Sequence, residues 1–335
     1  MKKTNYLFLF LLCICSLKNV NAQVDPHFSQ YYVYPQWLNP ALTGVMDGDY
    51  RVAGVYRSQW QNFNGGFSTI GIAAEYATQK DFNIGFGMFQ QTAANGGYKY
   101  LTPYASAAYT GIKFGKNGTH RVSVGINAGV INRRFDRSKF TFGDQWNPVS
   151  GFSVANPTGD VIQTPQSTVF DMGAGALYFD GTPNKKANIY FGFSVAHLTQ
   201  PLDPFTDGPS KQKMPSRYTF HGGVKIQMSE TVSLTPNFLY LMQGQARETM
   251  FGAYAQIRGN DVFDFLCGAN YRINDAFVPF VGFNHKDFVL GFSYDANISD
   301  LGRAVNGVNS FEISLSFTGR KKKNYDTQNF ICPRL

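Results

Sequence analysis

The five histidines are the first place to look for catalytic or metal-binding chemistry in this chain. They are His27, His120, His197, His221 and His285. None of them stands at the spacing of a metal-ligand pair or within a hydrolase motif, and no Gly-x-Ser-x-Gly sequence occurs. The sequence therefore predicts no catalytic residue, no metal ligand and no cofactor-binding residue, and we expect a protein that is not an enzyme.

Glycine-rich runs and carboxylates point to structure rather than to catalysis. Gly85-Phe86-Gly87 and Gly173-Ala174-Gly175 lack the third glycine of a dinucleotide fingerprint and fall in expected strands, where small residues fit bends of a barrel wall. Glu75, Asp264 and Glu312 fall on the polar side of expected strands. Inward-facing charges of a barrel normally form pairs across the lumen, and we favour this role over a catalytic pair of carboxylates.

Basic and aromatic side chains cluster in two expected loops, and protein docking is the chemistry that fits them. Arginine and aromatic residues dominate the binding energy of protein interfaces. The candidate partner-binding residues are Arg133, Arg134, Phe140, Phe142, Trp146, Phe152, Lys211 and Lys213. Solvated charge or contact with lipopolysaccharide remains an alternative for the basic members.

The first 22 residues resemble a secretory leader. Lys2 and Lys3 precede an apolar run, and the segment ends on Ala22, which predicts cleavage before Gln23. Lipidation of Cys13 or Cys15 would need a small residue before the cysteine, but leucine and isoleucine stand there. After cleavage only Cys267 and Cys332 remain; free thiols are favoured, although a disulfide between them stays open.

The composition of the chain is unusual for a soluble protein. Charged residues make up 16%, against roughly 25% in ordinary soluble domains. Part of the net charge of +8 belongs to the leader, and the rest is too dispersed to indicate binding to nucleic acid. The mature chain has no apolar run near the ~20 residues of a membrane-spanning helix, which leaves a closed barrel as the way into a bilayer.

Alternation of apolar and polar residues with period two predicts strands from residue 49 onward. In the last segment Phe311, Ile313 and Leu315 alternate with Glu312 and Ser314. The strands expected in this way are 49–60, 68–78, 82–93, 98–114, 120–135, 167–180, 187–198, 217–228, 232–243, 248–257, 262–274, 276–285, 288–297 and 309–319. About fourteen strands is an even number, as bacterial outer-membrane barrels require.

The expected connections differ in length according to the strand that they leave. All the long ones follow odd-numbered strands, whereas those after even-numbered strands are tight turns. This parity is typical of a transmembrane antiparallel outer-membrane β-barrel with both termini in the periplasm. Aromatic residues near strand ends, such as Tyr98, Tyr100, Phe179 and Tyr294, fit interfacial girdles or a core.

Two segments flank the expected barrel of residues 49–319. Residues 23–48 contain Pro26, Pro35, Pro40 and Gly44 and are expected to be irregular, either plugging the lumen or lining the periplasmic mouth. Residues 320–335 begin with Arg320 and three lysines and read as a basic periplasmic tail, with a docking segment as the alternative.

The mature amino terminus resembles the opening of the PorP/SprF family of type IX secretion membrane proteins. The motif residues there are Asp25, Pro26, Phe28, Ser29, Gln30, Tyr31, Asn39, Pro40, Ala41 and Gly44. The block Arg217-Tyr218-Thr219-Phe220-His221-Gly222-Gly223 resembles another family block. So do residues 56–60, 196–201, 294–295, 310–315 and 332–334.

This resemblance implies an outer-membrane barrel of the Bacteroidota, without enzymatic activity, that serves type IX secretion or gliding motility. Its implied partners are outer-membrane lipid, periplasmic secretion or motility components, and a secreted protein with a C-terminal sorting domain. An outer-membrane pore or ligand-specific transporter is the alternative function, because nothing in the strands decides whether the lumen is open.

Overall fold

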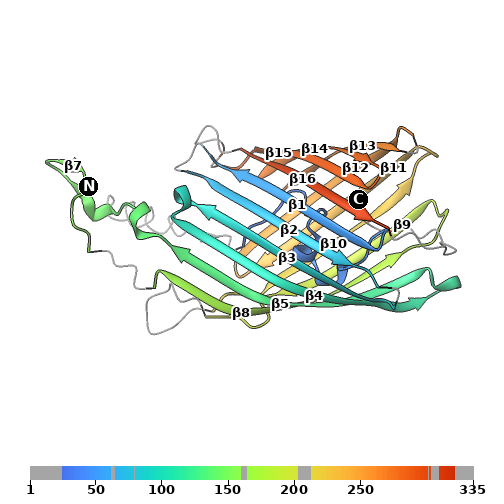
Figure 1. Ribbon diagram of the computed structural model, residues 1–335. Helices are drawn as coiled ribbons and strands as arrows, with labels where there is room; N and C mark the ends of the chain where they lie inside the picture. The colour runs from blue at the N-terminus through green and yellow to red at the C-terminus, as the bar shows by residue number, and fades with distance from the viewer. Residues whose placement is uncertain are drawn as a thin grey trace, which may run out of the picture.

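A closed antiparallel barrel forms most of the computed structural model, which describes residues 25–61, 65–78, 80–159, 164–202, 213–260, 262–300, 302 and 309–320. The barrel closes where β1 (Tyr50–Gln59) pairs with β16 (Ser310–Gly319) (Figure 1). The other barrel strands are β2 (Phe67–Tyr76), β3 (Phe82–Ala93), β4 (Tyr98–Phe114), β5 (His120–Phe135), β8 (Gln166–Asp180), β9 (Ala187–Ala196), β10 (Arg217–Gln227), β11 (Val232–Gln243), β12 (Ala246–Arg258), β13 (Phe263–Arg272), β14 (Ala276–His285) and β15 (Phe288–Asn297). The predicted all-β barrel of about fourteen strands is confirmed.

The closing pair of strands is as regular as its neighbours. The register of β1 and β16 runs without interruption from Tyr50 opposite Gly319 to Gln59 opposite Ser310. The ladder between β4 and β5 shifts its register between Tyr109 and Ile112. Continuous pairing around the ring leaves no unpaired strand edge.

The faces of the strands are inverted relative to a soluble sandwich. On β16 the apolar side chains of Phe311 and Leu315 are 41% and 50% exposed, whereas Glu312 and Ser314 are buried. On β5 the outward residue Ile126 is exposed and the inward Ser123 is buried. The apolar side chains thus form the outer surface, and the polar side chains line the interior.

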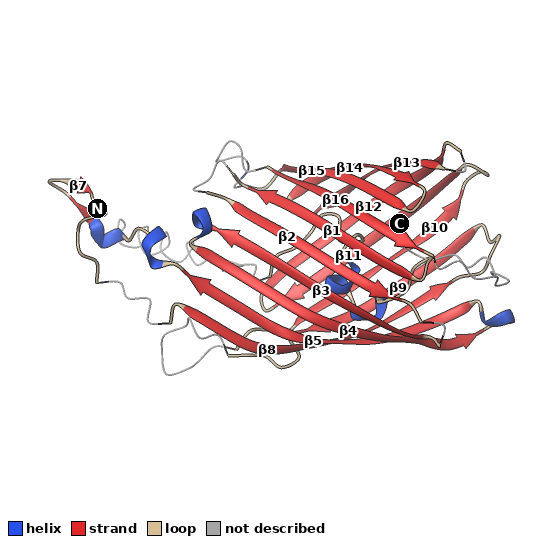
Figure 2. Cartoon of the chain, in the orientation of Figure 1, coloured by secondary structure: helices blue, strands red, loops and turns tan. Residues whose placement is uncertain are grey.

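The two rims of the barrel differ. At one rim, here called the long-loop rim, β5, β9 and β15 lead into extended connections, although the links after β3, β11 and β13 are short. At the opposite, short-turn rim, β1 begins, β16 ends and every connection is brief. Figure 2 shows the slanted strands between these rims and the excursion after β5, which projects away from the barrel.

That excursion was expected to be a long loop, and it contains a small hairpin. The 3-10 helices η4 (Arg137–Lys139) and η5 (Gly143–Gln145) lead into β6 (Trp146–Asn147) and β7 (Gly151–Phe152), which pair only with each other. Two-residue strands are too short to produce a visible alternation. The short 3-10 helices η2 (Ala94–Gly96) and η3 (Lys116–Gly118) form turns between barrel strands.

Two of the aromatic residues expected at strand ends belong to the interior. Tyr100 and Phe179 are 2% and 1% exposed, so neither contributes to an outer girdle. Both belong to the inward-facing set of their strands; for Tyr100, the same parity includes Thr102 and Ser106, which are also buried. In the described part of the chain, no helix is long and apolar enough to cross a membrane.

Candidate functional site

Residues 25–46 lie inside the barrel, and together with Asp47 and Gly48, which lead out of it, they are here called the lumenal segment (Figure 1). The segment contains a single helical turn, α2 (Pro35–Leu38), and the 3-10 turn η1 (Pro40–Leu42). Each begins with proline, which suits the first position of a helix because its missing N–H would have no partner there. The Asn39 side chain caps η1 by accepting a hydrogen bond from Ala41 N at 2.9 Å.

The amino end of the lumenal segment is held by charge at the long-loop rim. Asp25 accepts a hydrogen bond from Nη1 of Arg217 at 2.9 Å and lies 2.7 Å from Nε2 of His197. The other imidazole nitrogen of His197 lies 2.7 Å from Asp171. Arg217 also donates to the carbonyl of Trp37 at 2.7 Å and stacks over its ring.

The protonation states of this cluster follow from its geometry. Burial favours the neutral forms of both groups, but the opposing charges outweigh it. The pKa of Asp25 is held well below its usual range by His197 and Arg217. Burial would lower the pKa of His197, yet Asp25 and Asp171 raise it to about 9. His197 is therefore an imidazolium that bridges two carboxylates at neutral pH.

A second ionic cluster holds Ser29 and Gln30 against the seam between β1 and β16. The backbone N–H groups of Ser29 and Gln30 donate to the two carboxylate oxygens of Glu312 at 2.6 and 2.8 Å. Arg57 on β1 pairs with Glu312 on β16 and, at 2.9 Å, with Asp295 on β15. The hydroxyl of Ser29 donates to Asp295 at 2.7 Å and accepts from Arg57 at 2.7 Å. Buried charges need such partners, so the segment is part of the structure that holds the seam.

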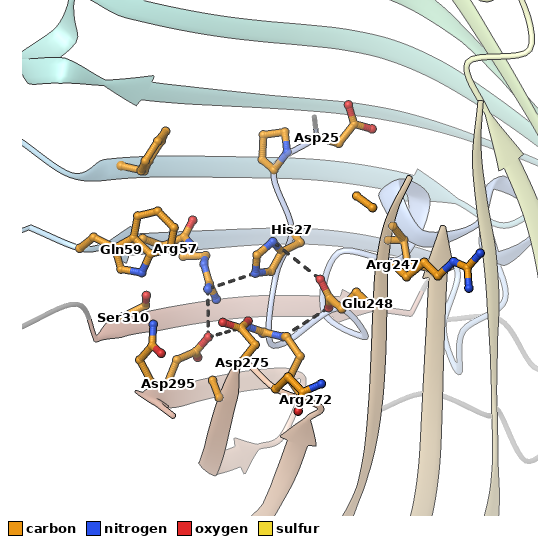
Figure 3. A pocket seen from close by; sticks show the side chains of 18 of the residues that line it. Asp25, His27, Arg57, Gln59, Arg247, Glu248, Arg272, Asp275, Asp295 and Ser310 are labelled. Carbon is orange, nitrogen blue, oxygen red and sulfur yellow. Dashed lines mark hydrogen bonds and ion pairs between the residues drawn. The ribbon is translucent and has the colours of Figure 1, made fainter. Parts of the chain in front are cut away.

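A cavity of about 730 Å³, here called the vestibule, opens beside this cluster. Figure 3 shows His27 between Arg57 and Glu248, with Arg272 between Glu248 and Asp295. Burial, together with Arg272 and Arg57, keeps the pKa of His27 well below its usual range. The 3.8 Å approach of His27 to Glu248 is therefore not an ion pair. The vestibule is lined by strand ends of the long-loop rim and by residues 25–27.

Deeper in the lumen the segment binds backbone groups of the wall. Nδ2 of Asn39 donates to the carbonyls of Ala176 at 3.0 Å and Phe193 at 3.3 Å and lies 3.1 Å from His221 Nε2. The hydroxyl of Ser194 donates to the carbonyl of Leu38 at 2.7 Å. These contacts fix the segment against β8, β9 and β10.

Glycines in the wall make room for this close packing. A Cβ atom on Gly125 would lie 2.5 Å from the backbone of Pro40, and one on Gly175 would lie 2.1 Å from Asn39 Oδ1. Gly85 likewise faces Gln36. One glycine of each run, Gly85 and Gly175, is thus small because the lumenal segment occupies the space that a side chain would need, whereas Gly87 and Gly173 face side chains and backbone of the wall itself.

The segment leaves the lumen at the short-turn rim. Gly44 adopts φ +70°, a conformation that favours glycine, and its N–H donates to Glu75 at 2.7 Å. Glu75 also accepts a hydrogen bond at 2.5 Å from Arg51. Glu75 and Glu312 are thus paired, but with arginines directly opposite them on the neighbouring strand β1 and not across the lumen as expected. Asp264 accepts hydrogen bonds from Gln256 and Asn284. Asp49 N donates to the carbonyl of Gly319 at 2.9 Å, where β1 begins.

The sequence blocks on which the family resemblance rests meet inside the barrel. Asp25 of the opening block contacts Arg217, and Asn39 contacts His221, although each pair is more than 180 residues apart. Five further residues of the opening block are buried within the segment: Pro26, Phe28, Tyr31, Pro40 and Ala41. Gly222 and Gly223 on β10 leave space for Phe238 and Tyr190 respectively. Four residues that complete the two ionic clusters were not among the predicted site residues, although each lies in one of the sequence blocks that resemble the family. They are His197, Arg57, Asp295 and Glu312.

The candidate partner-binding residues are not all available at the surface. Trp146 and Phe152 are 59% and 50% exposed and face one another across the hairpin. Arg134 is exposed, but Arg133 is 8% exposed and belongs to the inward-facing set of β5, which removes it from the surface offered to a partner. Arg133 and Ser123 are an even number of residues apart on the same strand, so the alternation of the sequence already indicated that both side chains point inward.

The remaining candidates have different settings. Phe140 and Phe142 are half-buried, and the ring of Phe140 lies 6.0 Å from that of Phe135 at the base of the hairpin. Lys213 is exposed in an isolated bridge with Leu202. Three predictions lie outside the described residues: those for Lys211, for cleavage after Ala22 and for Cys332. Among the described residues Cys267 forms no disulfide, and its pairing with Cys332 stays open.

The projecting hairpin, defined as residues 137–159, has a polar centre. The side chain of Gln145 donates to the carbonyls of Val154 and Asn156 at 3.2 and 3.1 Å and accepts from Phe142 N at 2.9 Å. Asp144 accepts from Gly159 N at 2.7 Å. Hydrogen bonds thus hold the hairpin while its apolar side chains point outward, an arrangement suited to binding rather than to catalysis. Among the described residues, none of the His, Cys, Asp and Glu groups is arranged to hold a metal ion.

Comparison with solved structures shows the barrel fold. The toluene transporter TbuX of Ralstonia pickettii has a TM-score of 0.52 and 13% identity, over 87% of this chain and 94% of TbuX. The monoaromatic hydrocarbon channel CymD has a TM-score of 0.48 and 11% identity, over 89% of this chain and 95% of CymD. The P. putida toluene transporter TodX has a TM-score of 0.48 and 9% identity, over 85% of this chain and 93% of TodX. At these identities the likeness carries no statement about a transported molecule.

The family comparison extends over nearly the whole chain. Residues 20–317 match the type IX secretion system membrane protein PorP/SprF family. No curated protein matches the chain. The match includes the lumenal segment and all the strands that hold it. The chain therefore belongs to the PorP/SprF family of type IX secretion system membrane proteins.

Proposed function

We propose that this protein is an outer-membrane component of type IX secretion that holds a secreted partner at the cell surface through its projecting hairpin. The observation that carries the proposal is the hairpin itself. Trp146, Val149, Phe152 and Val154 are at least half exposed on a substructure whose centre is hydrogen-bonded and polar. Exposed apolar side chains on a preformed element are the residues that bury themselves in a partner.

The inverted barrel supports the proposed membrane placement. An apolar outer face and a sealed ring of backbone hydrogen bonds suit hydrocarbon, where an unpaired N–H or C=O is costly. In outer-membrane barrels the longer loops face outward and the short turns face the periplasm. This orientation places the projecting hairpin outside the cell and the start of β1 and the end of β16 in the periplasm, together with the basic tail 320–335.

The filled lumen supports an anchoring role over an open pore. The side chains of Phe28, Gln30, Tyr34 and Asn39 are fully buried between the segment and the wall, so little of the cross-section at their level is open. The partner proposed for this role carries a C-terminal sorting domain, and the family membership supports a partner within type IX secretion. Periplasmic secretion or motility components would meet the short-turn rim.

The test is retention of the partner on cells that carry an altered hairpin. Deleting residues 140–160 should release the partner into the medium while the barrel remains in the membrane. The finer variant Trp146→Ala/Phe152→Ala removes two exposed rings, and losing hot-spot contacts worth ~2 kcal/mol weakens binding roughly 30-fold.

A matched control uses an exposed apolar residue of another loop at the same rim. Leu202 is 45% exposed, and Leu202→Ser should leave the partner on the cells. An unchanged distribution of the partner in the hairpin deletion, with the barrel present at normal amounts, would refute the hairpin as the docking element.

A further inference from the structure

The lumenal segment runs in one direction through the barrel. Its amino end lies at the long-loop rim, where Asp25 is held by Arg217, the first residue of β10, and by His197, just beyond the end of β9. Its carboxyl end lies at the short-turn rim, where Asp49 binds Gly319, the last residue of β16. The chain therefore crosses the lumen before the first strand crosses the wall in the opposite direction.

The crossing is fixed at intermediate depths. Ser29 and Gln30 bind Glu312, the third residue of β16 counted from the long-loop rim. Tyr31 donates to Asn237 at 2.8 Å near the middle of β11, and Gln36 donates to the carbonyl of Ala74 at 3.2 Å, two residues from the end of β2. Each of these contacts lies at a different depth of the barrel. Together they fix the position of the segment along the barrel axis.

We infer that the mature amino terminus is displayed on the outer side of the membrane, at the vestibule, and not in the periplasm. The inference rests on the orientation given under the proposed function. A chain cut before Gln23 has two residues ahead of Asp25, and two residues span at most about 7 Å. Such a terminus stays at the long-loop rim, on the same side as the projecting hairpin.

The vestibule adjoins this terminus. Its lining includes Asp25, Pro26 and His27, which directly follow the terminal residues. Carboxylates and guanidinium groups both line it, and Arg272 pairs there with Glu248, Asp275 and Asp295. The amino terminus and the vestibule thus form one polar external surface, at the rim that the partner approaches.

The lumenal segment also contacts the two strands that close the ring. The ring is closed by ten residue pairs between β1 and β16, and the lumenal segment touches both sides of that closure through Arg57 and Glu312. Because Glu312 is the third residue of β16 from the long-loop rim, these contacts hold the amino end of the segment near that rim.

The experiment compares three positions of one epitope tag in intact cells. The tag is inserted between Ala22 and Gln23, between Val149 and Ser150 at the hairpin tip, or after Arg320 beyond β16. We expect an antibody to label the first two on intact cells with similar intensity and to reach the third only after the outer membrane is permeabilised. Labelling of the hairpin tag without the amino-terminal tag would overturn the inference and leave the proposed orientation standing. If the hairpin tag is also hidden, the orientation and the inference fail together.

A smaller probe covers the case in which the tag prevents assembly. Val24→Cys in a Cys267→Ser/Cys332→Ser background is treated with a membrane-impermeant maleimide, and Asp47→Cys, at an exposed position of the short-turn rim, is the matched control. We expect the thiol introduced at position 24 to react on intact cells and the control to remain unmodified. Protection of position 24 together with reaction of the control would contradict the inference.

Discussion

The lumenal segment and the projecting hairpin use the same kinds of side chain in opposite ways. In the lumenal segment, polar groups such as Ser29 and Asn39 are buried and bonded to the wall, and the rings of Phe28 and Trp37 pack together. In the hairpin a polar centre around Gln145 serves only the hairpin itself, and its largest rings face outward. A buried element bonded to the wall resists change, whereas an exposed apolar one gains stability only when a partner covers it. The first therefore stabilises the fold, and the second is the element proposed to recognise a partner.

Removing the lumenal segment gives the largest expected change. A barrel of eight strands is filled by its own side chains, whereas about sixteen strands leave an aqueous channel, so fourteen strands need additional material to be closed. We expect the intact protein to show no steady conductance in planar bilayers and a variant lacking residues 25–46 to conduct. A steady channel from the intact protein would instead support the pore or transporter alternative. Deletion of hairpin residues 140–160 should leave the membrane as tight as before.

The ionic cluster at the seam gives the next largest effect. Glu312→Gln removes the charge that faces Arg57 while the side chain keeps its size, and breaking a buried pair costs about 3–5 kcal/mol. The measurement is the free energy of unfolding in denaturant, with heat-modified migration as a check of closure. Trp146→Ala in the hairpin should change that free energy by less than about 0.5 kcal/mol. If both variants lost the same unfolding free energy, the result would contradict the view that the seam cluster stabilises the fold and the hairpin does not.

The Asp25–His197 contact predicts a pH dependence confined to the lumen. The folded pKa of His197, about 9, exceeds the ordinary value of 6.5. Its contribution to stability is therefore complete below about pH 6.5 and is lost as the pH rises through 9. A shift of this size corresponds to about 3 kcal/mol.

The unfolding free energy of the intact protein should thus fall between pH 6 and pH 10 relative to His197→Asn. The same change of pH should leave proteolysis of the projecting hairpin in the folded protein unaltered. Parallel pH profiles for the intact protein and His197→Asn would contradict the assignment of His197 as a charged bridge.

The strands could be predicted because each carries its own local signal. Phe311, Glu312 and Ile313 alternate regardless of what surrounds them, and parity alone would have placed Tyr100 and Arg133 on the inner face. The position of the lumenal segment depends instead on contacts such as that between Ser29 and Glu312, 283 residues apart. No periodicity in residues 23–48 reports such a contact, so plug and mouth lining remained equal alternatives. The sequence blocks that resemble the family contain the residues that hold the segment, but they do not indicate which of these residues contact each other.

Glycine substitutions give the smallest expected effect and compare the two regions directly. A methyl group on Gly125 would lie 2.5 Å from the backbone of Pro40, which cannot move aside as a flexible side chain would. A methyl group on Gly143 in the hairpin meets nothing within 4 Å. We expect Gly125→Ala to lower the free energy of unfolding by about 1–3 kcal/mol, as overpacking does. Gly143→Ala should leave it within about 0.5 kcal/mol, and a neutral Gly125→Ala would mean that the segment does not press against β5 as tightly as the structure has it.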